Sequence, residues 1–358
     1  KIKPSICFSV KSNSNIKILN ELKKKGCGAD VVSMGEMLAA LKAGVHPSKI
    51  VFSGVGKTKE ELEFAIKNKI LLINIESESE AKLINQLSKK KLKHTSVGIR
   101  LNPNINAKTI KKITTGLNEN KFGLTEKNFL NLVLKIKSFK NLSLECLSVH
   151  IGSQILNINP FKKTLKVIER IIIKTNFNFK YIDLGGGIGI SYNKAKTLNL
   201  KEYAALVEKF TLKHKCKIIF EPGRLIIGNS AAIITKIIYI KKTQKKDFII
   251  LDSGMNDLIR PALYNARHSI VPIKKNKYKY KKTVEFVGPI CESSDKFLSS
   301  KNYQQIKEND ILLILDVGAY GMSLSSNYCF RPKLAEILID KNKIKIVRKK
   351  ENLKNLLK

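Results

Sequence analysis

Residues 6–14 read Ile-Cys-Phe-Ser-Val-Lys-Ser-Asn-Ser, a short apolar run that stops at Lys11 and gives way to small polar residues. An amphipathic stretch, residues 15–25, follows at once, with apolar residues spaced three and four apart. This order predicts a buried strand, a turn and a helix that packs back against the strand. The same order recurs along the chain to about residue 225, so this stretch is the first of a series of βα units.

The series predicts eight strands, at residues 6–11, 28–33, 50–54, 71–76, 96–102, 144–153, 181–187 and 217–224. Helices are predicted at residues 15–25, 34–43, 59–67, 78–89, 126–137, 161–175 and 200–214. Nearly continuous apolar strands are typical of a parallel sheet buried on both faces. We therefore predict an α/β fold, with a (β/α)8 TIM-like barrel over residues 1–229. A doubly wound open sheet is the alternative, but no G-x-G-x-x-G turn follows the first strand.

The rhythm changes after about residue 229, where strand-like runs follow one another with few long helices between them. We predict strands at residues 231–241, 247–252, 283–289, 310–316 and 336–348. This pattern predicts a second, mostly β C-terminal domain over residues 230–358.

The charge of the chain is strongly positive, with 67 Lys plus Arg against 29 Asp plus Glu and a formal net charge of +38. Only seven of these 67 residues are Arg, and the lysines are spread evenly along the sequence. A nucleic-acid surface would favour Arg for bidentate contacts, so we interpret the excess as compositional drift and expect no nucleic-acid partner. No apolar run approaches the roughly 20 residues that span a bilayer, and we expect no membrane association.

The six cysteines are scattered, form no C-x-x-C pair and do not cluster with the five histidines. We therefore expect neither a metal site nor a disulfide framework. A reducing, cytoplasmic location is the natural expectation.

Chemically active residues gather where the predicted barrel strands end, which is where barrel enzymes place their active sites. They are Lys11, Asp30 followed by Glu36, Arg100 to Asn102, His150 to Ser153, Gly185 to Gly189, and Glu221 to Arg224. This set suits pyridoxal phosphate, which needs a lysine amine for its aldehyde and bare backbone N–H groups for its phosphate. It also needs an acid that keeps the pyridine nitrogen protonated, and Glu221 is placed for that, while His150 can stack on the ring.

Each feature alone has a simpler interpretation: the glycines as a tight turn, His150 as a hydrogen-bonded core residue, Lys11 as a solvated lysine. Their conjunction in one barrel favours the cofactor site. The second domain adds Arg260 and Tyr264, which share a face if helical, the Cys291-Glu292 turn, and Tyr320 in a turn of small residues. Simple packing or surface roles stay open for these five residues.

Several stretches together resemble the diaminopimelate decarboxylase family of fold-type III pyridoxal-phosphate enzymes. They are SVKSNSN, GADVVSMGE, IVFSGVGKT, IRLNPNINA, KITTGLNENKFG, SVHIGSQI, DLGGGIG, FEPGR, LDSGMNDLIRPALY, GPICESSD, DVGAYGMSLSSNY and NYCFRPKLAEIL. The family's fold, a barrel plus a β domain similar to that of alanine racemase, agrees with the fold predicted from the residues.

The resemblance implies a role for each matching residue. Lys11 would bind the cofactor covalently and Cys291 would donate a proton, and these two would be catalytic. The other cofactor-binding residues would be His150, Ser153, Gly185, Gly186, Gly187, Glu221, Pro222, Gly223, Arg224 and Tyr320. The substrate-binding residues would be Arg224, Arg260, Tyr264, Glu292 and Tyr320. The family forms homodimers with shared active sites, to which the Cys-Glu turn comes from the partner chain.

The implied reaction is decarboxylation of meso-2,6-diaminopimelate to L-lysine and carbon dioxide, the last step of lysine biosynthesis. Related decarboxylases of ornithine, arginine or carboxynorspermidine are the alternatives, but arginines such as Arg260 favour a substrate with a distal carboxylate. A non-catalytic homologue is disfavoured because Lys11 and Cys291 are both present. Family members carry several dozen residues before the lysine strand, whereas ten precede Lys11, so we expect that a natural N-terminal segment is missing.

Overall fold

The computed structural model of the chain describes residues 2–107, 116, 120–192 and 196–357. Part of the KITTGLNENKFG stretch, residues 112–123, lies outside them. The chain forms two compact units: the first contains the residues up to Ile190 together with Lys196–Leu225, and the second contains Ser191, Tyr192 and the residues from Ile226 onward. Each unit is described below by itself.

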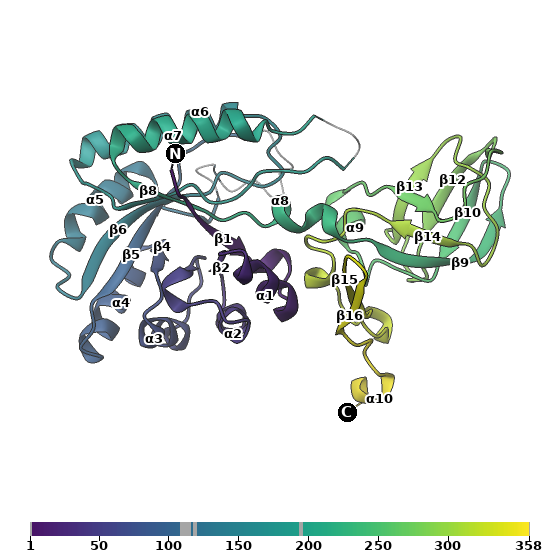
Figure 1. Cartoon of the computed structure of the whole chain (residues 1–358), viewed down its shortest axis with the longest axis horizontal. Helices are drawn as coiled ribbons and strands as arrows, with labels where there is room; N and C mark the ends of the chain where they lie inside the picture. Colours follow the sequence, from purple (N-terminus) through teal and green to yellow (C-terminus); the bar gives the residue numbers. More distant parts are fainter. Residues whose placement is uncertain (1, 108–115, 117–119, 193–195, 358) are drawn as a thin grey trace. The chain divides into compact units, whose positions relative to one another are not determined.

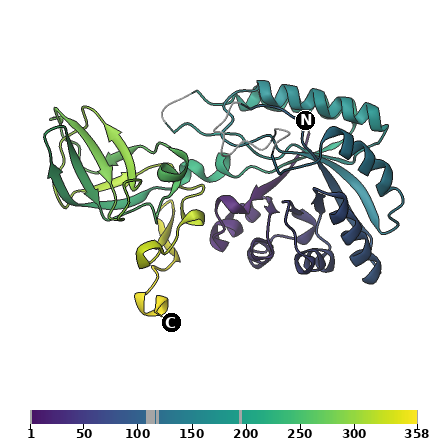
Figure 2. The same cartoon turned by 180° about the vertical axis from the view of Figure 1, so that it is seen from behind.

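Eight parallel strands close a barrel in the first unit, with each strand paired to the next and β1 paired to β8. The strands are β1 (Ser5–Ser9), β2 (Gly28–Val31), β3 (Ile50–Phe52), β4 (Leu72–Ile75), β5 (Thr95–Leu101), β6 (Leu142–Val149), β7 (Tyr181–Asp183) and β8 (Lys217–Phe220). The helices are α1 (Ile16–Lys24), α2 (Met34–Lys42), α3 (Lys59–Asn68), α4 (Glu78–Lys90), α5 (Glu126–Ile136), α6 (Asn159–Thr175), α7 (Leu200–His214) and the short α8 (Arg224–Ile227). Figures 1 and 2 show the long helices of this unit outside the strands. The predicted α/β barrel is confirmed.

Local chemistry explains where the helices begin. The side chains of Ser33, Thr58 and Ser77 each accept a hydrogen bond from the backbone N–H three residues later, at the first turns of α2, α3 and α4. These caps satisfy N–H groups that a helix start otherwise leaves unpaired. The strands β2, β3 and β4 are buried along their whole length, which explains their continuous apolar sequence.

All eight predicted barrel strands extend too far at their carboxyl ends, by one to four residues. β1 stops at Ser9, and Lys11 lies in a single 3-10 turn, Val10–Ser12. β7 stops at Asp183 and β8 at Phe220, so the glycines and Glu221 lie in the loops that follow. Gly185 and Gly187 have φ of 63° and 90°, conformations that are incompatible with a strand. The candidate residues therefore lie in loops directly after the strands, which is where barrel enzymes place their catalytic groups.

A six-stranded sheet in the order β11-β14-β9-β10-β12-β13 forms the core of the second unit. Its strands are β9 (Ile233–Lys242), β10 (Lys246–Leu251), β11 (Ile270–Pro272), β12 (Thr283–Val287), β13 (Lys296–Ser300) and β14 (Ile311–Ile314). Buried residues of β9, β10, β12 and β14, among them Ile237, Ile249, Phe286 and Leu312, form one hydrophobic cluster. Two short helices, α9 (Arg260–Tyr264) and α10 (Leu353–Leu356), complete this unit. The sequence pattern missed β11 and β13, which are short.

The predicted strand at residues 336–348 is wrong as a single element. It is an antiparallel hairpin of β15 (Glu336–Asp340) and β16 (Lys343–Arg348), in which Asp340 pairs with Lys343. Lys341 adopts φ of 53°, the left-handed conformation that a two-residue hairpin turn requires. No Gly occupies this turn, so the sequence carried only a weak turn signal.

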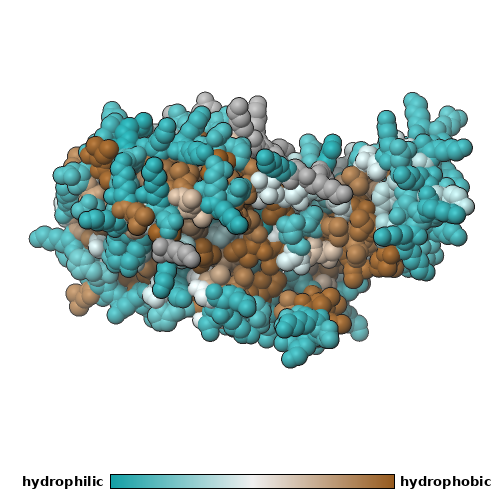
Figure 3. Space-filling model, turned by 45° about the horizontal axis from the view of Figure 1, so that its top comes forward, coloured by the Kyte–Doolittle hydropathy of each residue, from teal (hydrophilic) through white to brown (hydrophobic). Residues whose placement is uncertain are grey.

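Hydrophilic residues predominate on the face drawn in Figure 3, with hydrophobic residues gathered in smaller patches between them. This agrees with lysines spread over the surface. None of the helices in the described part of the chain has the length and apolar character that crossing a bilayer requires.

Candidate active site

Lys11 forms an ion pair inside the mouth of the barrel. Its Nζ lies 2.9 Å from Oδ2 of Asp30, and the hydroxyl of Ser9 donates to the same oxygen at 2.8 Å. The Asp30 side chain is fully buried, whereas that of Lys11 is 38% exposed. A lysine held by a buried carboxylate and still partly accessible can react with a small molecule, so the geometry separates Lys11 from the solvated lysines of the surface.

His150 follows β6 and is held as a neutral imidazole. The backbone N–H of Gly186 donates to its Nδ1 at 3.2 Å. Burial, together with the positive charges of Arg100 and Lys11, holds the pKa of His150 well below its usual range. A neutral ring with a fixed orientation offers a flat face for stacking against another ring system.

The turn after β7 is built from glycines because no other residue fits. A Cβ on Gly186 would lie 2.2 Å from the carbonyl oxygen of Glu221, and one on Gly187 would lie 2.4 Å from that of Gly152. Gly187 also has φ of 90°. This turn therefore presents backbone without side chains, which is what close approach of a phosphate requires.

The Glu221–Arg224 segment ties three strand ends together. The backbone N–H of Glu221 donates to the carbonyl oxygen of Gly185 at 2.8 Å, and that of Ser9 donates to the carbonyl oxygen of Pro222 at 3.2 Å. The guanidinium of Arg224 lies 3.3 Å from the hydroxyl of Ser153, to which it donates. A Cβ on Gly223 would come within 2.9 Å of Ser12. The structure thus brings the lysine turn, the glycine turn and this segment together.

The Glu221 carboxyl group is buried within the barrel. Its pKa is raised well above the ordinary value, first by burial and then by the carboxylates of Asp183 and Asp30. Lys11 acts in the opposite direction. A buried acid that retains its proton near neutrality suits a partner for a heteroaromatic nitrogen.

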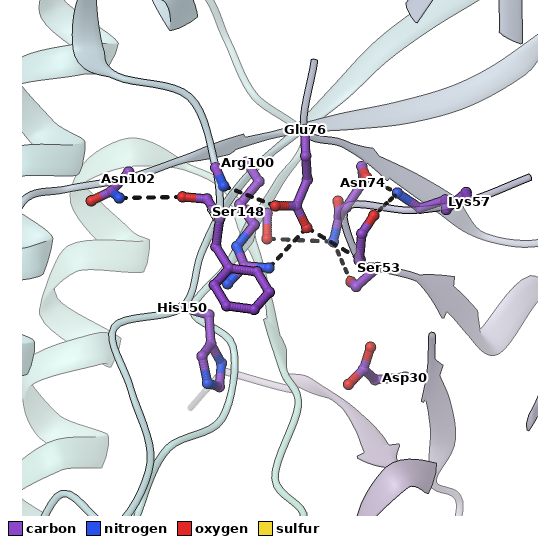
Figure 4. Close-up of polar contacts among 12 residues, drawn as sticks. Asp30, Ser53, Lys57, Asn74, Glu76, Arg100, Asn102, Ser148 and His150 are labelled. Atoms are coloured by element: carbon purple, nitrogen blue, oxygen red, sulfur yellow. Dashed lines mark hydrogen bonds and ion pairs between the residues drawn. The ribbon is translucent and has the colours of Figure 1, made fainter. Parts of the chain in front are cut away.

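A polar layer inside the barrel was not assigned by the sequence analysis. Its members are Ser9, Ser53, Asn74, Ser148, Asp183 and Glu221, and Figure 4 shows part of it. Five of them lie two positions after an apolar residue of a buried cluster: Cys7, Val51, Leu72, Cys146 and Ile219. Because side chains alternate along a strand, each pair points to the same side. A polar residue two positions after a buried apolar residue of a strand was therefore a signal in the sequence that could have located this layer.

A second missed group joins Glu76 to Arg100. Oε1 of Glu76 lies 2.9 Å from the Arg100 guanidinium, and its Oε2 accepts the N–H of Gly123 at 2.8 Å (Figure 4). Arg100 also lies over the ring of Phe122, 5.0 Å from its centroid. These contacts orient a buried cation at the end of β5, where a ligand phosphate or phenolate oxygen can be recognised.

The second unit holds the remaining predicted residues. Arg260 and Tyr264 are the first and last residues of α9, as their spacing predicted. Arg260 is buried, and its guanidinium lies 4.8 Å from the centroid of the Tyr192 ring. Tyr320 has φ of 59° in the turn after β14.

Cys291 and Glu292 lie in an exposed turn between β12 and β13. The carboxylate of Asp295 fixes the base of the turn, because it accepts the N–H groups of Ile290 and Met255, each at 2.7 Å. Glu292 accepts hydrogen bonds from the hydroxyls of Tyr328 and Ser294. The thiol of Cys291 is free and exposed, as a group that meets a substrate must be.

The chemistry of the barrel residues fits pyridoxal phosphate. The turn at Gly185–Gly187 cannot carry side chains, Lys11 is partly accessible, and Glu221 is a buried acid with a raised pKa. Each of these properties is one that the cofactor's phosphate, aldehyde or ring nitrogen demands.

Comparison with known proteins gives the same result. Residues 2–228 match the family model described as pyridoxal-dependent decarboxylase, pyridoxal binding domain. Diaminopimelate decarboxylase of Helicobacter pylori strain J99 is 44% identical, over 99% of this chain and 88% of that protein. The diaminopimelate decarboxylase of Aquifex aeolicus is 39% identical, over 97% of this chain and 83% of that protein.

Solved structures agree in fold. The crystal structure of the Helicobacter pylori enzyme complexed with L-lysine superposes with a TM-score of 0.93 at 42% identity, covering 99% of this chain and 89% of that one. A diaminopimelate decarboxylase of M. jannaschii in complex with L-lysine gives 0.92 at 35% identity, covering 99% and 84%. The chain therefore belongs to the pyridoxal-dependent decarboxylases and, within them, to the diaminopimelate decarboxylase family.

Proposed function

We propose that this chain is a carboxy-lyase that converts meso-2,6-diaminopimelate to L-lysine and carbon dioxide with pyridoxal phosphate. The observation that carries the proposal is the convergence of Lys11, His150, the glycine turn and Glu221 at one end of the barrel. The substrate follows from relatives that are 37–44% identical and carry the name diaminopimelate decarboxylase. This reaction is the last step of lysine biosynthesis.

The barrel residues bind and orient the cofactor. Lys11 would hold the cofactor covalently through its aldehyde. The turn at Gly185–Gly187, with Ser153 and Arg224, binds the phosphate, while neutral His150 stacks on the ring without adding a charge. Glu221 holds a proton at the ring nitrogen. When bound, pyridoxal phosphate supplies an electron sink for the pair of electrons left as carbon dioxide departs.

Asp30 prepares Lys11 for this role. Its carboxylate holds the amine at the end of β1 before the cofactor binds, at 2.9 Å.

The second unit supplies substrate recognition and the final proton. Arg260 and Tyr264 would bind the distal carboxylate of the substrate, and Glu292 would bind its distal ammonium. Tyr320 contacts both cofactor and substrate. The Cys291 thiol would donate its proton to the α-carbon after decarboxylation, as a positioned side-chain acid can.

We propose that the active form is a homodimer with shared active sites, in which the Cys291-Glu292 turn of one subunit serves the barrel of the other. The exposure of Cys291 in the single chain supports this arrangement. We also place the enzyme in the cytoplasm. All six cysteines are free, which fits a reducing compartment.

A decarboxylation assay with meso-diaminopimelate, ornithine, arginine and carboxynorspermidine tests the substrate. We expect turnover of meso-diaminopimelate and at most slow turnover of the others. Those compounds lack the distal amino-acid group whose carboxylate the Arg260 side chain would bind. Faster release of carbon dioxide from ornithine or carboxynorspermidine would contradict the proposal.

Attachment of the cofactor at Lys11 has its own test. Borohydride reduction of the loaded protein, followed by peptide mass spectrometry, should place the cofactor mass on the peptide that contains Lys11. Lys11→Ala should lose both this adduct and the visible absorbance of the cofactor, whereas Lys17→Ala, which removes an exposed lysine six residues along the chain, should retain both. An adduct on another lysine would overturn the assignment.

A further inference from the structure

A second buried carboxyl group lies beside Glu221, and none of the roles above uses it. Asp183 is the last residue of β7 and is fully buried. Its Oδ1 accepts the N–H of Gly185 at 2.9 Å. Its Oδ2 accepts from the hydroxyl of Ser148 and the amide of Asn74, each at 3.0 Å. Asp183 is therefore joined both to the glycine turn and to the other residues of the polar layer.

Asp183 and Glu221 lie in one buried network, because the Asn74 amide donates both to Asp183 and to the hydroxyl of Ser53, and each carboxyl group shifts the pKa of the other. A protein contact of the Glu221 carboxyl group is the hydroxyl of Ser53, 3.4 Å from Oε1. The charged and titratable groups around the pair are Asp30 in β2, Lys11 after β1, and the thiols of Cys7 and Cys146. Both thiols are kept neutral, since burial raises their pKa values well above the ordinary range.

Before the cofactor binds, two interacting buried carboxyl groups are not both ionised, so the pair shares one proton. The hydrogen-bond donors around each carboxyl group decide which of the two holds the shared proton. Asp183 accepts three well-formed hydrogen bonds, which favour its charged form, whereas the Ser53 contact with Glu221 is long. The proton therefore lies on Glu221.

We propose that Asp183 is a positioning residue whose negative charge makes Glu221 the acid that protonates the pyridine nitrogen of the cofactor. On binding, the proton leaves the Glu221 oxygen and a bond forms between it and the ring nitrogen. The carboxyl pair passes from one negative charge to two as the ring gains one positive charge, so the charge balances. This inference rests on the proposed place of Glu221 at the ring nitrogen.

The cofactor-free protein provides the first test. Infrared spectra should show the carbonyl stretch of a protonated carboxylic acid at neutral pH, and Glu221→Gln should remove a component that persists in Glu36→Gln, because Glu36 also holds a proton in this range. Absence of this component from the wild-type protein at neutral pH would overturn the proposal. This measurement needs no Asp183 variant, so it stands even if the substitution of Asp183 prevents folding.

The loaded enzyme provides the second test. With pyridine-¹⁵N-labelled cofactor, the nitrogen chemical shift is followed against pH in the wild type, Asp183→Asn and Ser148→Ala. Asp183→Asn keeps the shape but removes the charge, and we expect loss of the protonated nitrogen at a pH lower by about one unit or more. Ser148→Ala weakens the same network without removing a charge and should leave the titration within a few tenths of a unit.

The outcomes separate this inference from the proposed function. If Asp183→Asn titrates as the wild type does while Glu221→Gln loses the protonated nitrogen, Asp183 is only structural and the inference fails. If the nitrogen stays protonated in Glu221→Gln, the place of Glu221 at the ring is itself wrong.

Discussion

The guanidinium of Arg260 donates a hydrogen bond to Nε2 of His268 at 2.8 Å within the second unit. The other ring nitrogen of His268, Nδ1, lies 2.8 Å from the carbonyl oxygen of Leu315. An arginine cannot accept and a carbonyl cannot donate, so Nδ1 carries the proton and His268 is neutral. The rings of Tyr192 and His268 also pack edge to face, with their centroids 5.3 Å apart, and this contact further fixes the His268 ring. Arg260 is thus held in one orientation by a buried histidine.

Substitution of His268 should weaken substrate binding more than chemistry. His268→Gln places an amide oxygen near the position of Nε2 and keeps an acceptor for Arg260, whereas His268→Asn does not reach it. We expect His268→Asn to raise KM for meso-diaminopimelate by about tenfold or more, as for loss of a hydrogen bond to a charged group. His268→Gln should stay within a few-fold of the wild type. Steady-state kinetics and cofactor absorbance measure both effects.

Two results would argue against this role of His268. Equal losses in both variants would indicate a packing defect, and a fall in kcat at unchanged KM would place Arg260 away from the substrate.

Removal of the Cys291 thiol should slow turnover and leave cofactor binding intact. General acid catalysis contributes about 10²–10⁴-fold to rate, so Cys291→Ala should lower kcat by at least about 10²-fold. Cys329→Ala removes the other exposed thiol of the same unit and serves as the matched control. Single-turnover and steady-state rates of both variants are the measurement. Comparable activity in the two variants would show that another group delivers the proton.

Glu36 should make stability depend on pH near neutrality. Burial, with a smaller contribution from Asp30, raises its pKa to about 7, against the lowering effects of the Val32 N–H and Lys11. The folded chain therefore holds this proton more tightly than the unfolded chain does. The resulting stabilisation is complete below about pH 4.5 and disappears as the pH rises through 7.

The test compares the wild type with Glu36→Gln in urea unfolding at pH 5 and pH 8, without cofactor. We expect the difference in unfolding free energy between the two proteins to change by about 2 kcal/mol over this interval. Glu21→Gln, at an exposed position, should show almost no such change. A constant difference between wild type and Glu36→Gln would mean that Glu36 titrates as an ordinary glutamate.

Lys57 should be a structural lysine of the barrel. Its side chain is 1% exposed, and its ammonium group contacts Glu80 at 2.7 Å and the carbonyl oxygens of Gly54 and Asn74 at 2.6 and 2.7 Å. Lys57→Met leaves Glu80 and two carbonyls without this donor, so we expect the free energy of unfolding to fall by about 3–5 kcal/mol. Lys24→Met, which breaks the exposed pair with Glu21, should lower it by less than about 1 kcal/mol. Equal effects in denaturant unfolding would contradict the buried role.

Much of the fold was readable from periodicity. The predicted helix at residues 200–214 coincides with α7, and all eight barrel strands were found. Strand ends were less predictable, because Lys11 and Gly185 leave the strand through local backbone geometry. The hairpin at Lys341 was missed for the same reason, since a left-handed lysine carries no strong turn signal.

The sequence by itself determined the repeating βα units and the residue types at their ends, because hydrophobic periodicity and chain order are local properties. It did not determine that Asp30 meets Lys11, that Asp183 interacts with Glu221, or that His268 holds Arg260. These pairs are separated along the chain and meet only when the barrel closes or the sheet folds. Burial then couples their charges, because the desolvation that shifts a pKa exists only in the folded interior.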